Sequence, residues 1–166
     1  MARITLIRHG KAEMPRIGGD DFERGLIQRG MQNAEAVGQF IQDYKLLPDL
    51  VLVSPARRAR QTYELMSASW PNPPRVVYED KLYEVSADTL LRLIFEHGRD
   101  VESVAVVGHN PSLVVLLTHF SGLSMVRLIW VIFQPVVLPI LGLTPPKLVI
   151  LTRKRGDFFR WLERVI

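Results

Sequence analysis

Residues 4–10, ITLIRHG, join a short apolar run to an arginine, a histidine and a glycine. The apolar run is typical of a buried β-strand. A strand that ends here places Arg8 and His9 at its carboxyl edge, where open α/β sheets bind their ligands. The alternative is that Arg8 and His9 only begin a solvated loop, so the rest of the chain has to decide between the two interpretations.

Two more apolar runs along the chain end in the same way. Residues 50–53, LVLV, lead into Ser54-Pro55, and residues 104–107, VAVV, lead into Gly108-His109-Asn110. Helical patterns are expected at 31–44, 56–68 and 87–97, and a further strand at 76–78. Strands that alternate with helices predict a three-layer α/β/α fold with a mostly parallel central sheet. The length of 166 residues suits one domain over 1–166.

Local signals fix several helix boundaries. Ser86 is expected to cap the helix over 87–97. Asn110 is expected to cap the next helix, with Pro111 at its first position. The apolar face of the helix over 31–44 is expected to comprise Ala34, Val37, Ile41 and Tyr44.

The composition narrows the class of protein. Hydrophobic residues make up 48% of the chain, which predicts a globular domain. The sequence contains no cysteine, which excludes disulfides, thiolate metal sites and cysteine nucleophiles. The first residues run straight into the predicted strand without a signal-peptide pattern. We therefore expect a cytoplasmic protein.

The last third of the chain is harder to interpret. Residues 128–146 carry no charge, but prolines interrupt them, so this run is expected to form one or two core strands rather than a transmembrane span. Residues 153–164 hold five basic and two acidic residues and are expected to form a closing helix. The alternative is partner contact through 113–151 or the basic tail. No nucleic-acid-binding motif is present, and no nucleic-acid partner is expected.

The predicted strand ends assemble a candidate site. The carboxyl ends of parallel strands lie on one side of a sheet, which brings two histidines and at least two arginines around one crevice. Arginine forks bind phosphate in a charge-assisted and often bidentate manner. The sequence has no Walker A pattern and no metal-ligand spacing. Arginine charge can neutralise a phosphate in place of a metal ion, so no metal and no cofactor are expected.

A histidine in such a site can act as the nucleophile. Its attacking nitrogen must then be unprotonated, and the other nitrogen should donate to a backbone carbonyl that holds the tautomer. Nearby arginines lower the histidine pKa, which keeps the lone pair available. Water must then attack the phosphorylated enzyme in a second step.

Four stretches of the sequence resemble one known family. They read TLIRHGKAE (5–13), RGLIQRGMQNAEAVG (24–38), LVLVSPARRARQT (50–62) and VAVVGHNPSL (104–113). In this order they resemble the histidine phosphatase superfamily, which is phosphoglycerate mutase-like in fold. They are most similar to its small SixA-type phosphohistidine phosphatases. The resemblance covers residues 4–113.

The resemblance implies roles for individual residues. His9 matches the phosphorylated nucleophile, and Arg8 matches a phosphate-binding arginine. Arg58 matches the second phosphate-binding arginine, because it stands in the R-A-x-Q-T motif. His109 matches the second histidine, which hydrogen-bonds the transferring phosphoryl group.

Other positions follow or depart from the family pattern. Gly10 is expected to let the phosphate approach the backbone, and Asn110 is placed with the phosphate-binding residues. Leu26-Ile27 stands where the family often has Leu-Thr, which removes a helix-capping hydroxyl. Glu84, in Leu82-Tyr83-Glu84, matches the segment that supplies a general acid in larger members, an acid that SixA-type enzymes commonly lack.

The resemblance implies a phosphatase that removes phosphate from phosphohistidine in proteins through a covalent phosphohistidine intermediate. Short connections after each strand are expected to leave a crevice open to a protein side chain. One alternative is a metal-independent phosphatase of small phosphate monoesters, with Glu84 as the acid. A second alternative, ranked lower, is a non-catalytic binding module.

Overall fold

The computed structural model describes residues 2–121, 127–131 and 148–153. Its strands are β1 (Ala2–Arg8), β2 (Leu50–Val53), β3 (Arg75–Tyr78), β4 (Ser103–Gly108), β5 (Arg127–Val131) and β6 (Leu148–Arg153). Its helices are α1 (Gln28–Asp43), α2 (Arg57–Ser67), the 3-10 turn η1 (Asp80–Leu82), α3 (Ala87–Gly98) and α4 (Ser112–Ser121). These elements lie where the sequence patterns predict them, within a few residues.

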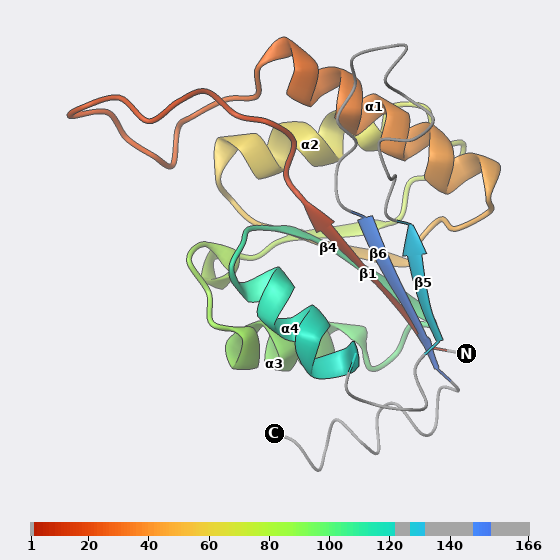
Figure 1. Ribbon diagram of the computed structural model, residues 1–166. Coiled ribbons are helices and arrows are strands. Elements are labelled where there is room, and N and C mark those ends of the chain that lie inside the picture. Colours follow the sequence, from red (N-terminus) through yellow and green to blue (C-terminus); the bar gives the residue numbers. More distant parts are fainter. Residues whose placement is uncertain (1, 122–126, 132–147, 154–166) are drawn as a thin grey trace.

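The strands form one sheet in the order β3-β2-β4-β1-β6-β5. Strands β3, β2, β4 and β1 run parallel, whereas β6 pairs antiparallel with both β1 and β5. Helices α1 and α2 cover one face of the sheet, and α3 and α4 cover the other (Figure 1). The predicted α/β/α fold with a mostly parallel sheet is therefore confirmed.

Side chains of β1 alternate between two hydrophobic cores, because successive residues of a strand face opposite sides of the sheet. Leu6 packs in the core that holds Leu90 of α3 and Leu116 of α4. Ile7 packs in the core that holds Val37 of α1 and Ala59 of α2. The buried strands β2 and β4 contribute to both cores in the same way, which fixes the strand ends relative to both helical layers.

Helices α1 and α2 approach each other at a glycine. A Cβ atom on Gly38 would collide with the backbone carbonyl of Met66, so only glycine allows this approach. The indole N–H of Trp70 donates to the Gly38 carbonyl over 3.1 Å. This contact sets the position of α2, which carries the arginines of the candidate site.

Two helix boundaries follow their predictions. The Ser86 hydroxyl accepts the Thr89 N–H over 3.2 Å and caps α3 as expected. Ile27 stands at the N-cap of α1 without a side-chain cap, in agreement with the missing hydroxyl noted in the sequence.

Two other boundary predictions are wrong. Tyr44 is exposed rather than part of the apolar face, because α1 ends at Asp43 and the tyrosine ring lies against Phe40 at 4.4 Å. Helix α4 begins at Ser112, so Pro111 precedes the helix and Asn110 is not its cap. The Pro111 carbonyl accepts the first helical bond, from Val115 over 3.0 Å.

Strand β5 begins the uncharged run 128–146, where one or two strands are expected, and β6 follows that run. Residues 122–126 and 132–147 lie outside the described residues. The expected closing helix falls on residues 154–166, which also lie outside them. Within the described part of the chain, no helix is both long and apolar enough to cross a membrane.

Candidate active site

Three neighbouring strands bring the candidate residues together at their carboxyl ends. The N–H of His9 donates to Gly108 over 3.1 Å, which continues the β1–β4 ladder. The N–H of Ser54 donates to Val107 over 3.0 Å, which continues the β2–β4 ladder. As a result the rings of His9 and His109, which are 100 residues apart in the sequence, have centroids 5.0 Å apart.

A backbone contact fixes the tautomer of His9. Its Nδ1 lies 2.7 Å from the Gly10 carbonyl oxygen, which can only accept a hydrogen bond. Nδ1 therefore carries the proton in the neutral ring, and Nε2 keeps its lone pair. This is the arrangement that the sequence argument required of a nucleophile.

The loop that follows His9 is itself held in place. The Gly10 N–H donates to the Thr62 hydroxyl over 3.0 Å, and this hydroxyl donates to the Arg58 carbonyl over 2.6 Å. A Cβ on Gly10 would lie 2.6 Å from the Gly30 carbonyl oxygen. Close packing against α1 therefore requires glycine here, in addition to the phosphate approach that the family resemblance implies.

The environment keeps His9 neutral. Burial, together with the charges of Arg58, Arg8 and Arg24, lowers the pKa of His9 to about 4, although its hydrogen bond to Gly10 opposes the shift. Burial is the largest cause, whereas the sequence argument named only the arginines. At neutral pH the Nε2 lone pair is therefore available for attack on an electrophile.

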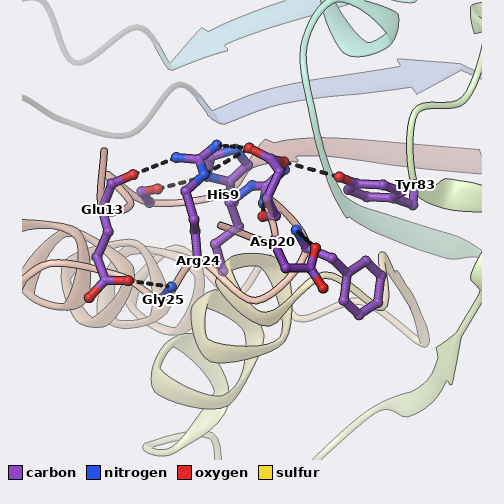
Figure 2. A network of polar contacts seen from close by, with 10 residues as sticks. His9, Glu13, Asp20, Arg24, Gly25 and Tyr83 are labelled. Carbon is purple, nitrogen blue, oxygen red and sulfur yellow. Dashed lines mark hydrogen bonds and ion pairs between the residues drawn. The ribbon is translucent and has the colours of Figure 1, made fainter. Parts of the chain in front are cut away.

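Arg58 is buried and bound to one acidic residue. Its Nη1 donates to the backbone carbonyl of Asp21 over 2.6 Å, and its Nη2 donates to Asp21 Oδ2 over 2.9 Å. The Tyr83 hydroxyl donates to the same Oδ2 over 3.0 Å, and Arg24 contacts Oδ1 at 2.6 Å. Arg24 and Tyr83 lie on opposite sides of this network of polar contacts (Figure 2).

Asp21 is therefore an ionised acceptor in the site. Burial raises its pKa, but the hydrogen bonds from Arg24 and Tyr83 and the charge of Arg58 outweigh this effect and hold the pKa below its usual value. A carboxylate with a lowered pKa is a poor proton donor at neutral pH. Asp21 orients two arginines and a tyrosine instead.

The segment after β1 carries Asp21 and Arg24 to the site. The N–H and the carboxylate of Glu13 both bond to Gly25, and Ile27 N–H donates to the Lys11 carbonyl over 3.0 Å. These bonds tie the two ends of the loop together beside α1, and Figure 2 shows the Glu13–Gly25 contact. The expectation of short connections is wrong for this one, because it extends from His9 to Ile27.

A hollow of about 350 Å³ lies beside this loop. Its lining includes Glu13, Met14, Arg16, Asp20, Arg24 and Arg57. Since Arg24 also contacts Asp21, the hollow adjoins the candidate site and offers both signs of charge to a neighbouring group.

His109 has one satisfied and one unsatisfied ring nitrogen. The Ser54 hydroxyl lies 2.7 Å from Nε2, and the Tyr83 ring stands edge-on at 5.7 Å. Nδ1 is buried and has no hydrogen-bond partner. Burial, followed by the neighbouring His9 and Arg58, lowers the pKa of His109 to about 3.

The structure brings His9, Gly10, Arg58 and His109 together, whereas Arg8, Glu84 and Asn110 are exposed. Arg8 and Asn110 are exposed at the ends of their strands. Glu84 is exposed and has a left-handed backbone with φ of 52°. The residue of that segment that reaches the site is the tyrosine before it.

The sequence argument missed Asp21, Arg24 and Tyr83 as residues that shape the site, and it placed Ser54 at the strand edge without giving it a role. Asp21 and Arg24 lie in a loop that the sequence marks as rich in glycine and charge. That signal places a loop near the strand end, but it does not say which charges turn inward. Among residues 2–121, 127–131 and 148–153, no three His, Asp or Glu side chains form a group suited to a metal ion.

A bare histidine nitrogen and a buried arginine, at the carboxyl edge of a parallel sheet, are groups that can attack and bind a phosphoryl group. Residues 4–100 match the histidine phosphatase superfamily (branch 1), and the chain belongs to this family. The family and the solved structures described next support phosphatase activity.

Relatives agree with this assignment. An uncharacterized protein of Mycobacterium tuberculosis is 34% identical over 119 residues, which cover 70% of this chain and 72% of that protein. The solved structure of a provisionally assigned phosphohistidine phosphatase SixA of Agrobacterium tumefaciens is 36% identical with a TM-score of 0.68. The match covers 74% of this chain and 79% of the chain in that structure. A similarly assigned SixA structure of Nakamurella multipartitia is 30% identical with a TM-score of 0.62, and the match covers 69% of this chain and 63% of that one.

Proposed function

We propose that this protein is a phosphatase that removes phosphate from phosphohistidine in proteins through a covalent intermediate on His9. The observation that carries the proposal is the hydrogen bond from His9 Nδ1 to the Gly10 carbonyl, which leaves Nε2 bare. Arg58 is buried beside it and supplies a fixed positive charge for the phosphoryl oxygens.

The proposed reaction has two displacements at phosphorus. His9 Nε2 attacks the phosphorus, the phosphorus–nitrogen bond of the substrate breaks, and its electron pair goes to the leaving imidazole nitrogen, which takes a proton from water. Water then attacks the phosphorus on His9, the Nε2–phosphorus bond breaks, and inorganic phosphate leaves. The water gives up its proton to solvent, and His9 returns to its starting state.

The surroundings of the leaving group favour a phosphorus–nitrogen substrate. Asp21 stays ionised because its pKa is lowered. Burial of the Tyr83 hydroxyl and its hydrogen bond to Asp21 raise the pKa of Tyr83. Neither group is suited to donate a proton to a poor leaving group at neutral pH. An imidazole nitrogen leaves without such a donor, whereas an alkoxide does not.

One observation favours the second candidate, a metal-independent phosphatase of small phosphate monoesters with Glu84 as the acid. Glu84 holds a left-handed backbone with φ of 52° next to Tyr83, and such strain in a residue other than glycine is often retained at functional sites. The third candidate, a non-catalytic binding module, stays lowest, because both histidines and Arg58 are present in one place.

Three further expectations remain predictions. They are the single domain over 1–166, the cytoplasmic location, and partner contact through 113–151 or the tail.

Hydrolysis of a phosphohistidine peptide and of a panel of phosphate monoesters, without added metal, tests the proposal. We expect the wild-type protein to hydrolyse the peptide selectively and His9→Ala to abolish turnover, because the nucleophile is gone. Glu84→Gln should leave peptide hydrolysis nearly unchanged. A matched control is His97→Ala, since His97 pairs with Glu79 away from the site and should keep turnover.

Two outcomes would contradict the proposal. Peptide hydrolysis at the same rate in wild type and His9→Ala would exclude a nucleophilic His9. Ester hydrolysis that depends on both His9 and Glu84, without peptide hydrolysis, would favour the ester phosphatase instead.

A further inference from the structure

The contact between Ser54 and His109 has no role in the reaction as proposed so far. Ser54 is fully buried, and its Oγ lies 2.7 Å from Nε2 of His109. The other ring nitrogen, Nδ1, is buried without a partner. Unpaired buried polar atoms are rare in folded proteins and call for an explanation.

The hydrogen atoms of this pair can be arranged in two ways. If His109 Nε2–H donated to Ser54, the serine hydroxyl would have to donate elsewhere, and the described residues offer it no second partner. If Ser54 donates to Nε2, its hydroxyl is satisfied and the ring proton lies on Nδ1. In the free protein each arrangement leaves one donor without a partner, the Ser54 hydroxyl in the first and the His109 Nδ1–H in the second. With a phosphoryl group bound, the second arrangement is preferred, because Nδ1–H can donate to a phosphoryl oxygen, whereas the first sets a bare Nδ1 against that oxygen.

The position of the free Nδ1 gives this choice a chemical consequence. The His109 ring has the His9 ring at 5.0 Å and the Tyr83 ring at 5.7 Å, so it belongs to the phosphate site. Phosphoryl oxygens without protons accept hydrogen bonds and do not donate them. His109 is neutral at pH 7, since its pKa is about 3, and a neutral ring has only one N–H to offer.

We propose that Ser54 is a positioning residue that holds His109 in the Nδ1–H tautomer, so that this N–H donates to a phosphoryl oxygen. The inference rests on the proposed function, because it takes the ligand of the site to be a phosphoryl group. Ser54 acts only through His109 and needs no contact with the substrate.

The scaffold is well suited to this task. Ser54 directly follows β2, and its N–H is bound to Val107 of β4 over 3.0 Å. His109 directly follows the same β4 strand, so the hydroxyl and the ring are held by one ladder of backbone hydrogen bonds. Groups on rigid strands keep a hydrogen-bond geometry better than groups on loops.

The tautomer can be read directly by NMR of the protein labelled with ¹⁵N-histidine, since protonated and bare ring nitrogens have well-separated shifts. The chain has four histidines, and the His109 signals are identified by their loss in His109→Gln. We expect a protonated Nδ1 and a bare Nε2 in the wild type at pH 7. Ser54→Ala should lose this pattern, and Ser54→Thr, which restores a hydroxyl, should regain it.

Ser112→Ala is the matched control. The Ser112 hydroxyl is also buried and also bonds to His109, but to its backbone carbonyl, over 3.0 Å. Its removal should leave the tautomer of the His109 ring unchanged. The amide spectrum of each variant shows whether it is folded, and Ser54→Ala removes only one oxygen atom from the core.

Turnover gives a second measurement. Loss of one preorganised hydrogen-bond donor lowers kcat by about 10²-fold in comparable sites. In Ser54→Ala the Nδ1–H tautomer should still be partly populated, so we expect kcat to fall by about tenfold. A protonated Nε2 in the wild type, or an unchanged tautomer in Ser54→Ala, would overturn the inference. Because the tautomer is measured without substrate, a failure of the proposed function would appear separately, as absent hydrolysis with the tautomer pattern intact.

Discussion

At the scale of single residues, neighbouring arginines of α2 differ sharply in environment. Arg58 is buried and donates twice to Asp21, whereas Arg57 is exposed and makes one long contact of 3.3 Å to the Glu23 carbonyl. A buried guanidinium that is already oriented presents its charge to a phosphate at little entropic cost. The family resemblance singles out the same residue, because only Arg58 stands in the R-A-x-Q-T motif.

Replacing these two arginines should therefore have unequal effects. We expect Arg58→Ala to lower kcat/KM for the phosphohistidine peptide by about 10²-fold or more, because a fixed charge at the phosphate is lost. Arg57→Ala, the matched control on the same helix, should cost much less. Equal losses in the two variants, with both folded by circular dichroism, would show that the phosphate-binding arginine is misassigned.

At the scale of elements, the site depends on how α1 meets α2. Gly38 allows the backbone of α1 to touch Met66 of α2, and the Trp70 indole bonds to the Gly38 carbonyl. Helix α2 carries Arg58 in its first turn. It also carries Thr62, whose hydroxyl accepts a hydrogen bond from the Gly10 N–H. A change at the crossing is therefore transmitted to the loop beside His9.

Gly38→Ala should destabilise the protein by about 1–3 kcal/mol, because the added methyl overpacks a contact between two backbones. Urea denaturation followed by circular dichroism measures the change in the free energy of unfolding. Glu35→Ala lies on the exposed face of the same helix and should change it by less than about 0.5 kcal/mol. If Gly38→Ala were as stable as Glu35→Ala, the close approach of the two helices would be refuted.

At the scale of the whole molecule, a parallel sheet and a long loop enclose two histidines that are neutral when folded. The pKa of His9 is about 4 and that of His109 about 3, whereas the ordinary value is 6.5. Between these values the unfolded chain binds more protons than the folded one. Stability therefore rises with pH across this window and is lost as the pH falls toward 3.

The free energy of unfolding should consequently be lower at pH 5 than at pH 7.5 in urea denaturation. His9→Gln removes one of the two titrating groups, so it should reduce the difference between the two pH values. Gln32→Ala, which replaces an exposed side chain that does not titrate, serves as the control and should keep the wild-type difference. A pH dependence that is the same in wild type and His9→Gln would show that burial of His9 does not couple to folding.

The framework of this protein follows from local patterns in its sequence. Apolar runs such as 4–7 and 104–107 specify strands, and parallel strands share one carboxyl edge, so His9 and His109 had to meet there. The Ser86 cap and the uncapped Ile27 were also predictable, because capping depends on a few adjacent residues. The end of α1 before Tyr44 could not be predicted in this way, because helix ends depend on packing as well as on periodicity.

The polar groups that complete the site depend instead on how the chain packs in three dimensions. Asp21 and Arg24 lie in a loop without periodicity, and their partners Arg58 and Tyr83 are distant in sequence. The Ser54 hydroxyl meets His109 only because two strand ends lie side by side. Such contacts follow from the path of the chain in space, and the size of each pKa shift follows from burial, which no local pattern specifies.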